Sequence, residues 1–139
     1  MRRLFATLCT AAVLLAGCGS DGGGGATNPQ STSPVGTWNL TSANGAPLPF
    51  AFFVRGVKYE ILWDKYVFLP DGSFTETYQL RDTDGTIVGL EDLYDSGSWK
   101  LTGTTFVITY ADNGATASGT FTNNTVTLTQ LGALMVYNR

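Results

Sequence analysis

The chain has 139 residues, of which 43% are hydrophobic and 14% charged, and its formal net charge is −3. Because phosphate binding requires a basic patch, this acidic balance argues against a nucleic acid as partner. The sequence has no histidine and only two cysteines, Cys9 and Cys18, which excludes histidine-dependent catalytic triads, histidine metal ligands and a zinc site built from several thiolates. We therefore predict no enzyme, no metal site and no dissociable cofactor.

The first residues have the pattern of a signal peptide. Arg2 and Arg3 precede an apolar stretch over residues 4–15, which is shorter than the about 20 residues of a membrane-spanning helix. The stretch leads to Leu15-Ala16-Gly17-Cys18, which resembles the lipobox of bacterial lipoproteins. This resemblance implies that residues 1–17 are removed and that Cys18 carries a diacylglycerol and an N-acyl chain. An ordinary signal peptide with a chance cysteine, or a buried hydrophobic helix, are the alternatives.

The predicted anchor implies a location. Two or more acyl chains give stable membrane attachment, whereas one gives marginal binding. In the lipoprotein pattern an aspartate after the cysteine favours retention in the inner membrane, and Gly19 stands there instead. The resemblance therefore implies a lipid-anchored protein of the bacterial cell envelope, in the outer membrane.

A spacer follows the predicted anchor. Residues 18–34 contain a run of glycines with Ser, Thr, Asn and Pro, and no aromatic or large aliphatic side chain. Such a segment buries too little apolar surface to offset its ordering entropy, so we predict a flexible tether. A phosphate-binding loop is the weaker alternative, because the Gly-Lys-Ser/Thr ending is absent.

The pattern of residues 35–139 predicts a single all-β domain. Turn dipeptides such as Asn44-Gly45, Asp71-Gly72 and Asn113-Gly114 separate segments in which apolar residues alternate with threonine. Eight short strands joined by hairpins favour a small antiparallel up-and-down barrel, which has no free edges. We expect either a short strand or a crossing segment at 50–55, an irregular stretch at 83–94, and at most one helical turn at 89–95. The eight strands are expected near 36–42, 58–69, 73–81, 96–101, 105–111, 116–122, 125–130 and 134–138.

Several short stretches resemble the lipocalins, and bacterial lipocalin-like lipoproteins in particular. They are Gly36-Thr37-Trp38, the wider segment 35–50, Gly97-Ser98-Trp99, the hairpin 116–130 and the ending Val136-Tyr137-Asn138-Arg139. The resemblance implies that Trp38 closes the bottom of the barrel and that Arg139 packs over it. A runner-up is the small β-rich domain of heat-shock-associated envelope lipoproteins, but its Gly-Cys-Asn signature is absent.

The lipocalin resemblance implies a small apolar molecule or lipid inside the barrel. The alternation places Tyr59 and Trp63 on one face of a strand, and Glu76 and Tyr78 on one face of the next, so these four are the candidate ligand-binding residues. An inward Glu76 would have a raised pKa through desolvation. The alternative is that a bulge turns Glu76 outward, and that the aromatic residues simply fill the core of a structural barrel that meets envelope proteins.

Two acidic patterns are weaker candidates. Asp82-Thr83-Asp84-Gly85 with Glu91 partly matches a calcium-binding loop, but Leu80 occupies its first position, so a hairpin turn is the better interpretation. A carboxylate-pair enzyme is also conceivable from the number of acidic residues, although nothing in the sequence places two of them across a cleft.

Overall fold

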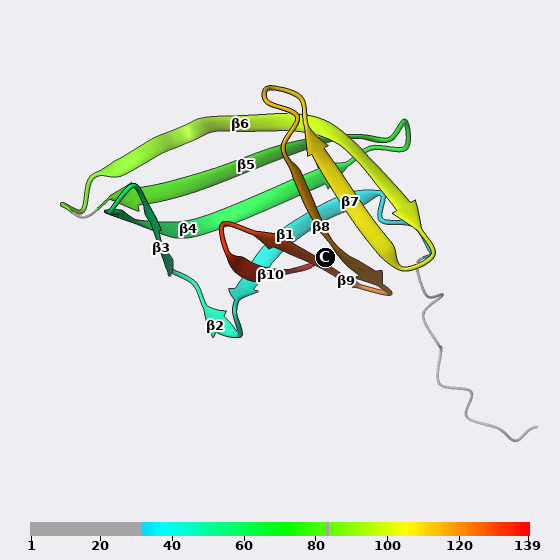
Figure 1. Cartoon of the computed structure of the whole chain (residues 1–139), viewed down its shortest axis with the longest axis horizontal. Coiled ribbons are helices and arrows are strands. Elements are labelled where there is room, and N and C mark those ends of the chain that lie inside the picture. Colours follow the sequence, from blue (N-terminus) through cyan, green and yellow to red (C-terminus); the bar gives the residue numbers. More distant parts are fainter. Residues whose placement is uncertain (1–31, 83) are drawn as a thin grey trace, which may run out of the picture.

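The computed structural model describes residues 32–82 and 84–139, and for residues 87–93 it describes the backbone without the side chains. The predicted signal peptide, Cys18 and the tether up to residue 31 lie outside the described residues. Among the described residues no helix is long and apolar enough to cross a membrane. The structure consists of ten strands (Figure 1): β1 (Gly36–Ala43), β2 (Ala46–Pro47), β3 (Phe50–Val54), β4 (Val57–Phe68), β5 (Ser73–Asp82), β6 (Ile87–Thr102), β7 (Thr105–Tyr110), β8 (Thr116–Thr122), β9 (Thr125–Gln130) and β10 (Ala133–Asn138).

Eight of these strands close into an antiparallel barrel. The sheet order is β2-β1-β10-β9-β8-β7-β6-β5-β4-β3, and β1 also pairs with β4, which joins the two sides of the sheet. Consecutive strands from β4 to β10 are neighbours, so the barrel has the up-and-down topology that the regular turn spacing predicted. The prediction of an all-β, eight-stranded barrel is therefore confirmed.

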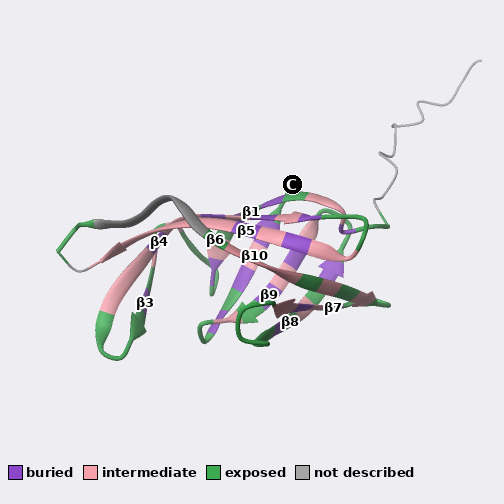
Figure 2. Ribbon diagram, turned by 90° about the horizontal axis from the view of Figure 1, so that it is seen from above, coloured by how far each residue is buried: buried purple, intermediate pink, exposed green. Residues whose placement is uncertain are grey.

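The strand β4 changes its neighbour halfway along its length. Its C-terminal half, Lys65–Phe68, pairs with Gly36–Asn39 of β1 and closes the barrel. Its N-terminal half, Val57–Ile61, pairs with β3 instead. The segment predicted at 50–55 is thus a strand, and it forms a hairpin beside the barrel rather than a ninth strand of the ring. The tip of this hairpin is exposed (Figure 2). It carries apolar side chains, of which Phe53 is 70% exposed.

Turn chemistry explains the hairpins. Asn44 and Gly45, between β1 and β2, both have positive φ angles, 51° and 76°. Asn and Gly tolerate this conformation best, which is why such dipeptides mark tight hairpins. Asp71-Gly72 separates β4 from β5, and Asn113-Gly114 separates β7 from β8. The turn signals in the sequence therefore divide the chain where the strands end.

The irregular stretch predicted at 83–94 is confirmed for the turn at 84–86 and wrong for residues 87–94, and the helical turn predicted at 89–95 is wrong. Residues 87–94 belong to β6, which runs beyond the predicted segment 96–101 to cover Ile87–Thr102. The register with β5 jumps here, because Tyr78 pairs with Leu93 whereas Leu80 pairs with Val88. This irregularity breaks the period-two alternation on which strand prediction depends.

A second bulge sets the inner face of β4. The register with β5 shifts between Ile61 and Trp63. Before the shift Ile61 is buried, and after it the buried positions are Asp64, Tyr66 and Phe68. The expectation that Tyr59 and Trp63 share a face is therefore wrong: the extra residue between Ile61 and Trp63 turns Trp63 away from the interior and brings Asp64 into it.

The hydrophobic core lies inside the barrel and is rich in aromatic residues. Tyr66 and Phe68 stack with centroids 5.4 Å apart, and Phe106 meets Phe68 edge-on at 4.9 Å. Where the wall is tight, glycine is required: a Cβ atom on Gly119 would lie 1.9 Å from the carbonyl oxygen of Thr127. Figure 2 shows buried residues alternating with less buried ones along the strands.

Candidate ligand-binding cavity

A cavity of about 410 Å³ lies at the end of the barrel that the aromatic core leaves open. Its volume is within the range of small-molecule pockets. One part of the wall is apolar, with Phe52 from β3, Ile61 from β4 and Leu80 from β5. The turns β7–β8 and β9–β10 complete the wall. The apolar lining is Phe52, Ile61, Leu80, Ala115, Ala117 and Leu131.

The other part of the wall is acidic. Four carboxylates line the cavity: Asp64, Glu76, Asp95 and Asp112. None of the described residues that line it is basic. The carboxylates come from three adjacent strands, β4, β5 and β6, and from the β7–β8 turn, so the topology brings together residues far apart in the sequence. Where these carboxylates are ionised, the described lining carries negative charge without positive charge, which favours a cationic group over an anionic one.

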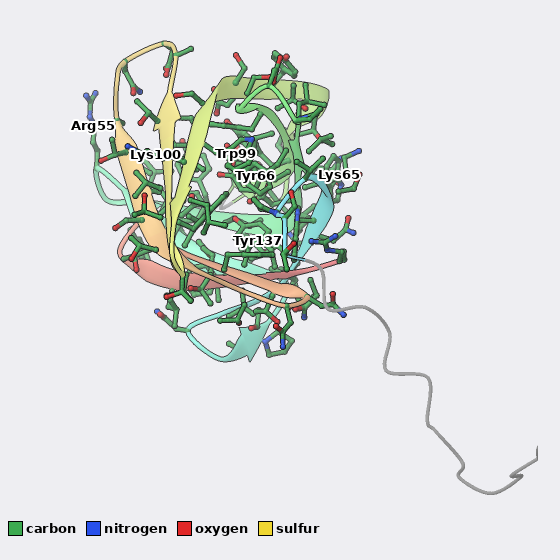
Figure 3. The ribbon with its side chains drawn as sticks, turned by 90° about the vertical axis from the view of Figure 1, so that its right-hand side faces the viewer. Arg55, Lys65, Tyr66, Trp99, Lys100 and Tyr137 are labelled. Carbon is green, nitrogen blue, oxygen red and sulfur yellow. The ribbon has the colours of Figure 1, made fainter. Side chains whose placement is uncertain are left out.

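A network of tyrosine hydroxyls forms the floor between cavity and core. The hydroxyls of Tyr66 and Tyr110 lie 2.6 Å apart, and each lies 3.3 Å from Oε1 of Gln130. Nε2 of Gln130 donates to the hydroxyl of Tyr137 at 2.9 Å, and Tyr137 donates to Oδ2 of Asp64 at 2.7 Å. Figure 3 shows Tyr66 and Tyr137 inside the barrel, whereas Lys65 projects outward. The network holds Asp64 in one orientation.

Two carboxylates of the site are buried, and each has an oxygen without a partner. Asp64 is 4% exposed and Glu76 is 5% exposed. Oδ1 of Asp64 and Oε2 of Glu76 make no hydrogen bond within the described structure. Burial raises the pKa of Asp64 to about 7, and burial together with the nearby Asp64 charge raises the pKa of Glu76 to about 8. The pair therefore retains protons near neutral pH.

The four residues predicted for ligand binding divide into two groups. Glu76 and Tyr78 line the cavity, and Glu76 is not turned outward. Tyr59 does not line it; its ring stacks on Phe52 with centroids 5.8 Å apart. Trp63 also lies outside the cavity lining, and its Nε1 donates to Oε1 of Gln79 at 3.2 Å.

Sequence reasoning missed Asp64, Asp95, Tyr110 and Gln130 as parts of the site. The signal for Asp64 was present, because it precedes Tyr66 and Phe68 in strict alternation. Before the bulge the inward positions are odd-numbered, Tyr59 and Ile61, and this alternation extends to Trp63 in the sequence. The sequence pattern therefore favours Trp63 over Asp64 as the inward residue. Asp95 and Tyr110 meet only through strand pairing across the sheet, which no local pattern reveals.

The opposite end of the barrel holds Trp38 and Arg139. The Cζ atom of Arg139 lies 4.3 Å from the centroid of the Trp38 ring, and Nη2 of Arg139 donates to the carbonyl oxygen of Ser33 at 2.7 Å. Nε1 of Trp38 donates to the carbonyl oxygen of Pro34 at 2.6 Å, and Phe121 meets its ring edge-on. Arg139 thus packs over Trp38, and the described part of the chain enters β1 at this end of the barrel, away from the cavity.

The acidic loop after β5 forms a turn. Oδ1 of Asp82 accepts from the backbone N–H groups of Asp84 and Thr86, and Oδ1 of Asp84 accepts from Thr86 at 2.8 Å. Thr83 and the Glu91 side chain lie outside what the structure describes. In the part of the chain that it does describe, no three potential ligands gather for a metal ion. The carboxylates of this loop are engaged in holding the turn.

A second hollow, of about 470 Å³, is more open and lies along β5, β6 and β7. Its lining includes Leu69, Thr75, Tyr94, Ser98 and Ala111, and no acidic or basic side chain among the described residues. It offers no convergent charged group, so the cavity described first is the stronger candidate site.

Comparison with known families agrees with this architecture. The family model of the lipocalin-like domain matches residues 35–131. A search of curated proteins found no match to the sequence. The matched residues span β1 to β9 and every strand that lines the cavity, and they make up more than half of the 139-residue chain. The chain therefore belongs to the lipocalin-like domain family.

Proposed function

We propose that this protein binds a small molecule in the cavity of its barrel and has no catalytic role. The observation that supports the proposal is the cavity itself, about 410 Å³ in volume, with an apolar wall on one side and buried polar groups on the other. Small-molecule sites commonly combine a mostly apolar lining with a few convergent polar groups. The apolar residues Phe52, Ile61 and Leu80 would contact the ligand body.

The alternative, a structural barrel with a filled core, describes only half of this barrel. Phe68, Phe74 and Phe106 pack the end near Trp38 and leave no room for a ligand there. At the other end the core is bounded by the hydrogen-bonded tyrosines. Beside them lie the buried carboxylates of Asp64 and Glu76, each with an oxygen that has no hydrogen-bond partner in the described structure. An end built only for stability would contain apolar side chains there, because unpaired buried polar groups are destabilising.

Native mass spectrometry of the protein from its own cells tests the binding proposal, because a bound molecule appears as a mass adduct. A neutral fluorescent probe, N-phenyl-1-naphthylamine, provides a second measurement. Leu80→Trp places a bulky ring in the cavity and should abolish probe fluorescence. Leu134→Trp adds the same ring at an exposed position outside the cavity and is the matched control. Equal probe binding by both variants, with no adduct in the native spectrum, would contradict the proposal.

We also propose that Cys18 anchors the domain to a bacterial membrane through covalent lipid, most consistent with the outer membrane because Gly19 follows it. The support is the sequence pattern alone. Since the chain enters the barrel beside Trp38 and Arg139, the cavity would face away from the point of attachment. Labelled palmitate should be incorporated by the wild type and not by Cys18→Ala, which should also leave the membrane fraction. A Cys18→Ala protein that stays membrane-bound would refute the anchor.

A further inference from the structure

The buried carboxylates at the base of the cavity lack a donor. Oδ1 of Asp64 and Oε2 of Glu76 are without hydrogen-bond partners, although both side chains are at least 95% buried. Buried acceptors in proteins are nearly always paired with a protein group, water or a ligand. The network on the other side of Asp64 is complete, since Tyr137 donates to its Oδ2. Both side chains belong to the lining of the cavity.

No cationic side chain of the described structure reaches these oxygens. Lys58 and Arg81 both pair with Glu60, which lies outside the cavity lining. Lys65 alternates with Asp64 and Tyr66 on β4 and projects outward (Figure 3). None of the described residues that line the cavity is basic. The positive charge that would pair with the ionised carboxylates is therefore not supplied by a described side chain, and a ligand cation can supply it in exchange for the bound protons.

We propose that the ligand class is an amphiphilic amine, whose ammonium group pairs with the carboxylates of Asp64 and Glu76 while its apolar body lies against Phe52, Ile61 and Leu80. The inference rests on the proposed binding function of the cavity. An ammonium group has three donors and a full positive charge, so one group can pair with both carboxylates. A fatty acid or another anion would bring its negative charge into a cavity lined by four carboxyl groups and by no basic side chain among the described residues.

Proton release accompanies this mode of binding. The pair holds protons near neutral pH because burial raises both pKa values, and an ammonium ion favours the charged carboxylates. Amine affinity should therefore rise between pH 6 and pH 8.5, a range in which an alkylamine stays protonated. The other titratable groups that face the pair from the surrounding elements are Tyr66 on β4, Tyr78 on β5, Asp95 on β6, Tyr110 on β7, Asp112 after β7 and Tyr137 on β10.

A series of ligands with the same chain and different head groups tests the proposal. Octylamine, 1-octanol and octanoate are titrated into the full-length protein, with displacement of the neutral probe as the readout. We expect octylamine to bind at least tenfold more tightly than 1-octanol at pH 8, and octanoate to bind most weakly. Calorimetry in two buffers of different ionisation enthalpy should show proton release with octylamine and none with 1-octanol.

Two variants assign the preference to the pair. Glu76→Gln should reduce octylamine affinity to the level of 1-octanol, and a far-ultraviolet circular dichroism spectrum equal to that of the wild type shows that the variant is folded. Glu60→Gln makes the same change outside the cavity lining, is the matched control and should change octylamine affinity less than threefold. Equal binding of octylamine and 1-octanol by the wild type would overturn the amine proposal and leave the binding function intact.

Two further outcomes also decide the matter. If calcium chloride displaces the probe from the wild type more effectively than octylamine does, the pair is a metal site and the amine proposal is wrong. If neither the ligands nor the neutral probe bind to the wild type, the proposed binding function fails together with the inference.

Discussion

The buried pair predicts an unusual dependence of stability on pH. An acid whose pKa is higher in the folded than in the unfolded protein binds protons more strongly when folded. For Asp64 and Glu76 the folded pKa values are about 7 and about 8, against ordinary values of 3.8 and 4.5. Their contribution to the free energy of unfolding is therefore fully present below about pH 4 and is lost as the pH rises to about 8.

Glu76→Gln isolates this contribution, because the amide keeps the shape of the side chain and does not titrate. A shift from 4.5 to about 8 corresponds to about 5 kcal/mol at 1.36 kcal/mol per pKa unit. This is an upper bound, since water in the cavity reduces the burial penalty. At pH 8.5 the variant should be more stable than the wild type by a few kcal/mol, and at pH 4.5 the two should be nearly equal.

Urea denaturation at half-unit intervals from pH 4.5 to pH 8.5 measures the difference between the two proteins. Contributions from other groups are shared and cancel in that difference. Glu60→Gln is a control of opposite sign: Lys58 and Arg81 lower the pKa of Glu60, so its contribution is present at neutral pH and lost in acid. Parallel curves for Glu76→Gln and wild type, or a wild type that gains stability relative to Glu76→Gln as the pH rises, would refute the reasoning.

Three other substitutions test separate parts of the fold. Arg139→Ala removes the cation–π contact with Trp38, worth about 0.5–2 kcal/mol, and should lower the melting temperature; an unchanged value would contradict a closing role. Gly119→Ala brings a methyl group against the Thr127 carbonyl and should cost about 1–3 kcal/mol or more in urea denaturation, with no effect expected only if the wall is looser than described. Tyr137→Phe leaves both hydrogen-bond partners of the hydroxyl unpaired and should cost about 1–3 kcal/mol; a neutral result would show that the network adds no stability.

Much of the barrel follows from local patterns. Strands such as β7 and β9 alternate apolar residues with threonine, and the turn dipeptides Asn113-Gly114 after β7 and Asn123-Asn124 before β9 separate them from β8, so their positions and the meander topology are readable in the sequence. A meander of eight strands also predicts closure, because closure removes the free edges. The contact of Arg139 with Trp38 was suggested by family resemblance and not by these patterns.

The candidate site was readable only in part. Glu76 and Tyr78 lie on the cavity face because β5 alternates regularly up to Tyr78. In β4 one extra residue reverses the alternation, so the sequence pattern predicts Trp63 in the cavity wall, whereas the structure has Asp64 there. The position of a β-bulge depends on how a strand pairs with its neighbours across the sheet. A short stretch of sequence therefore does not predict it. The pairing of Asp64 with Glu76 likewise depends on the register between two strands.

The change of neighbour along β4 has a kinetic consequence. Near Trp38 the wall is a complete ring, because β4 pairs there with β1. Beside the cavity β4 pairs with β3, which has no further neighbour, and Phe52 of β3 lines the cavity. Displacement of β3 from β4 exposes the cavity from the side, while the pairing of β4 with β1 and β5 stays intact. The rate of ligand exchange can therefore be set by β3 independently of the global stability of the barrel, and the two properties can vary separately among related sequences.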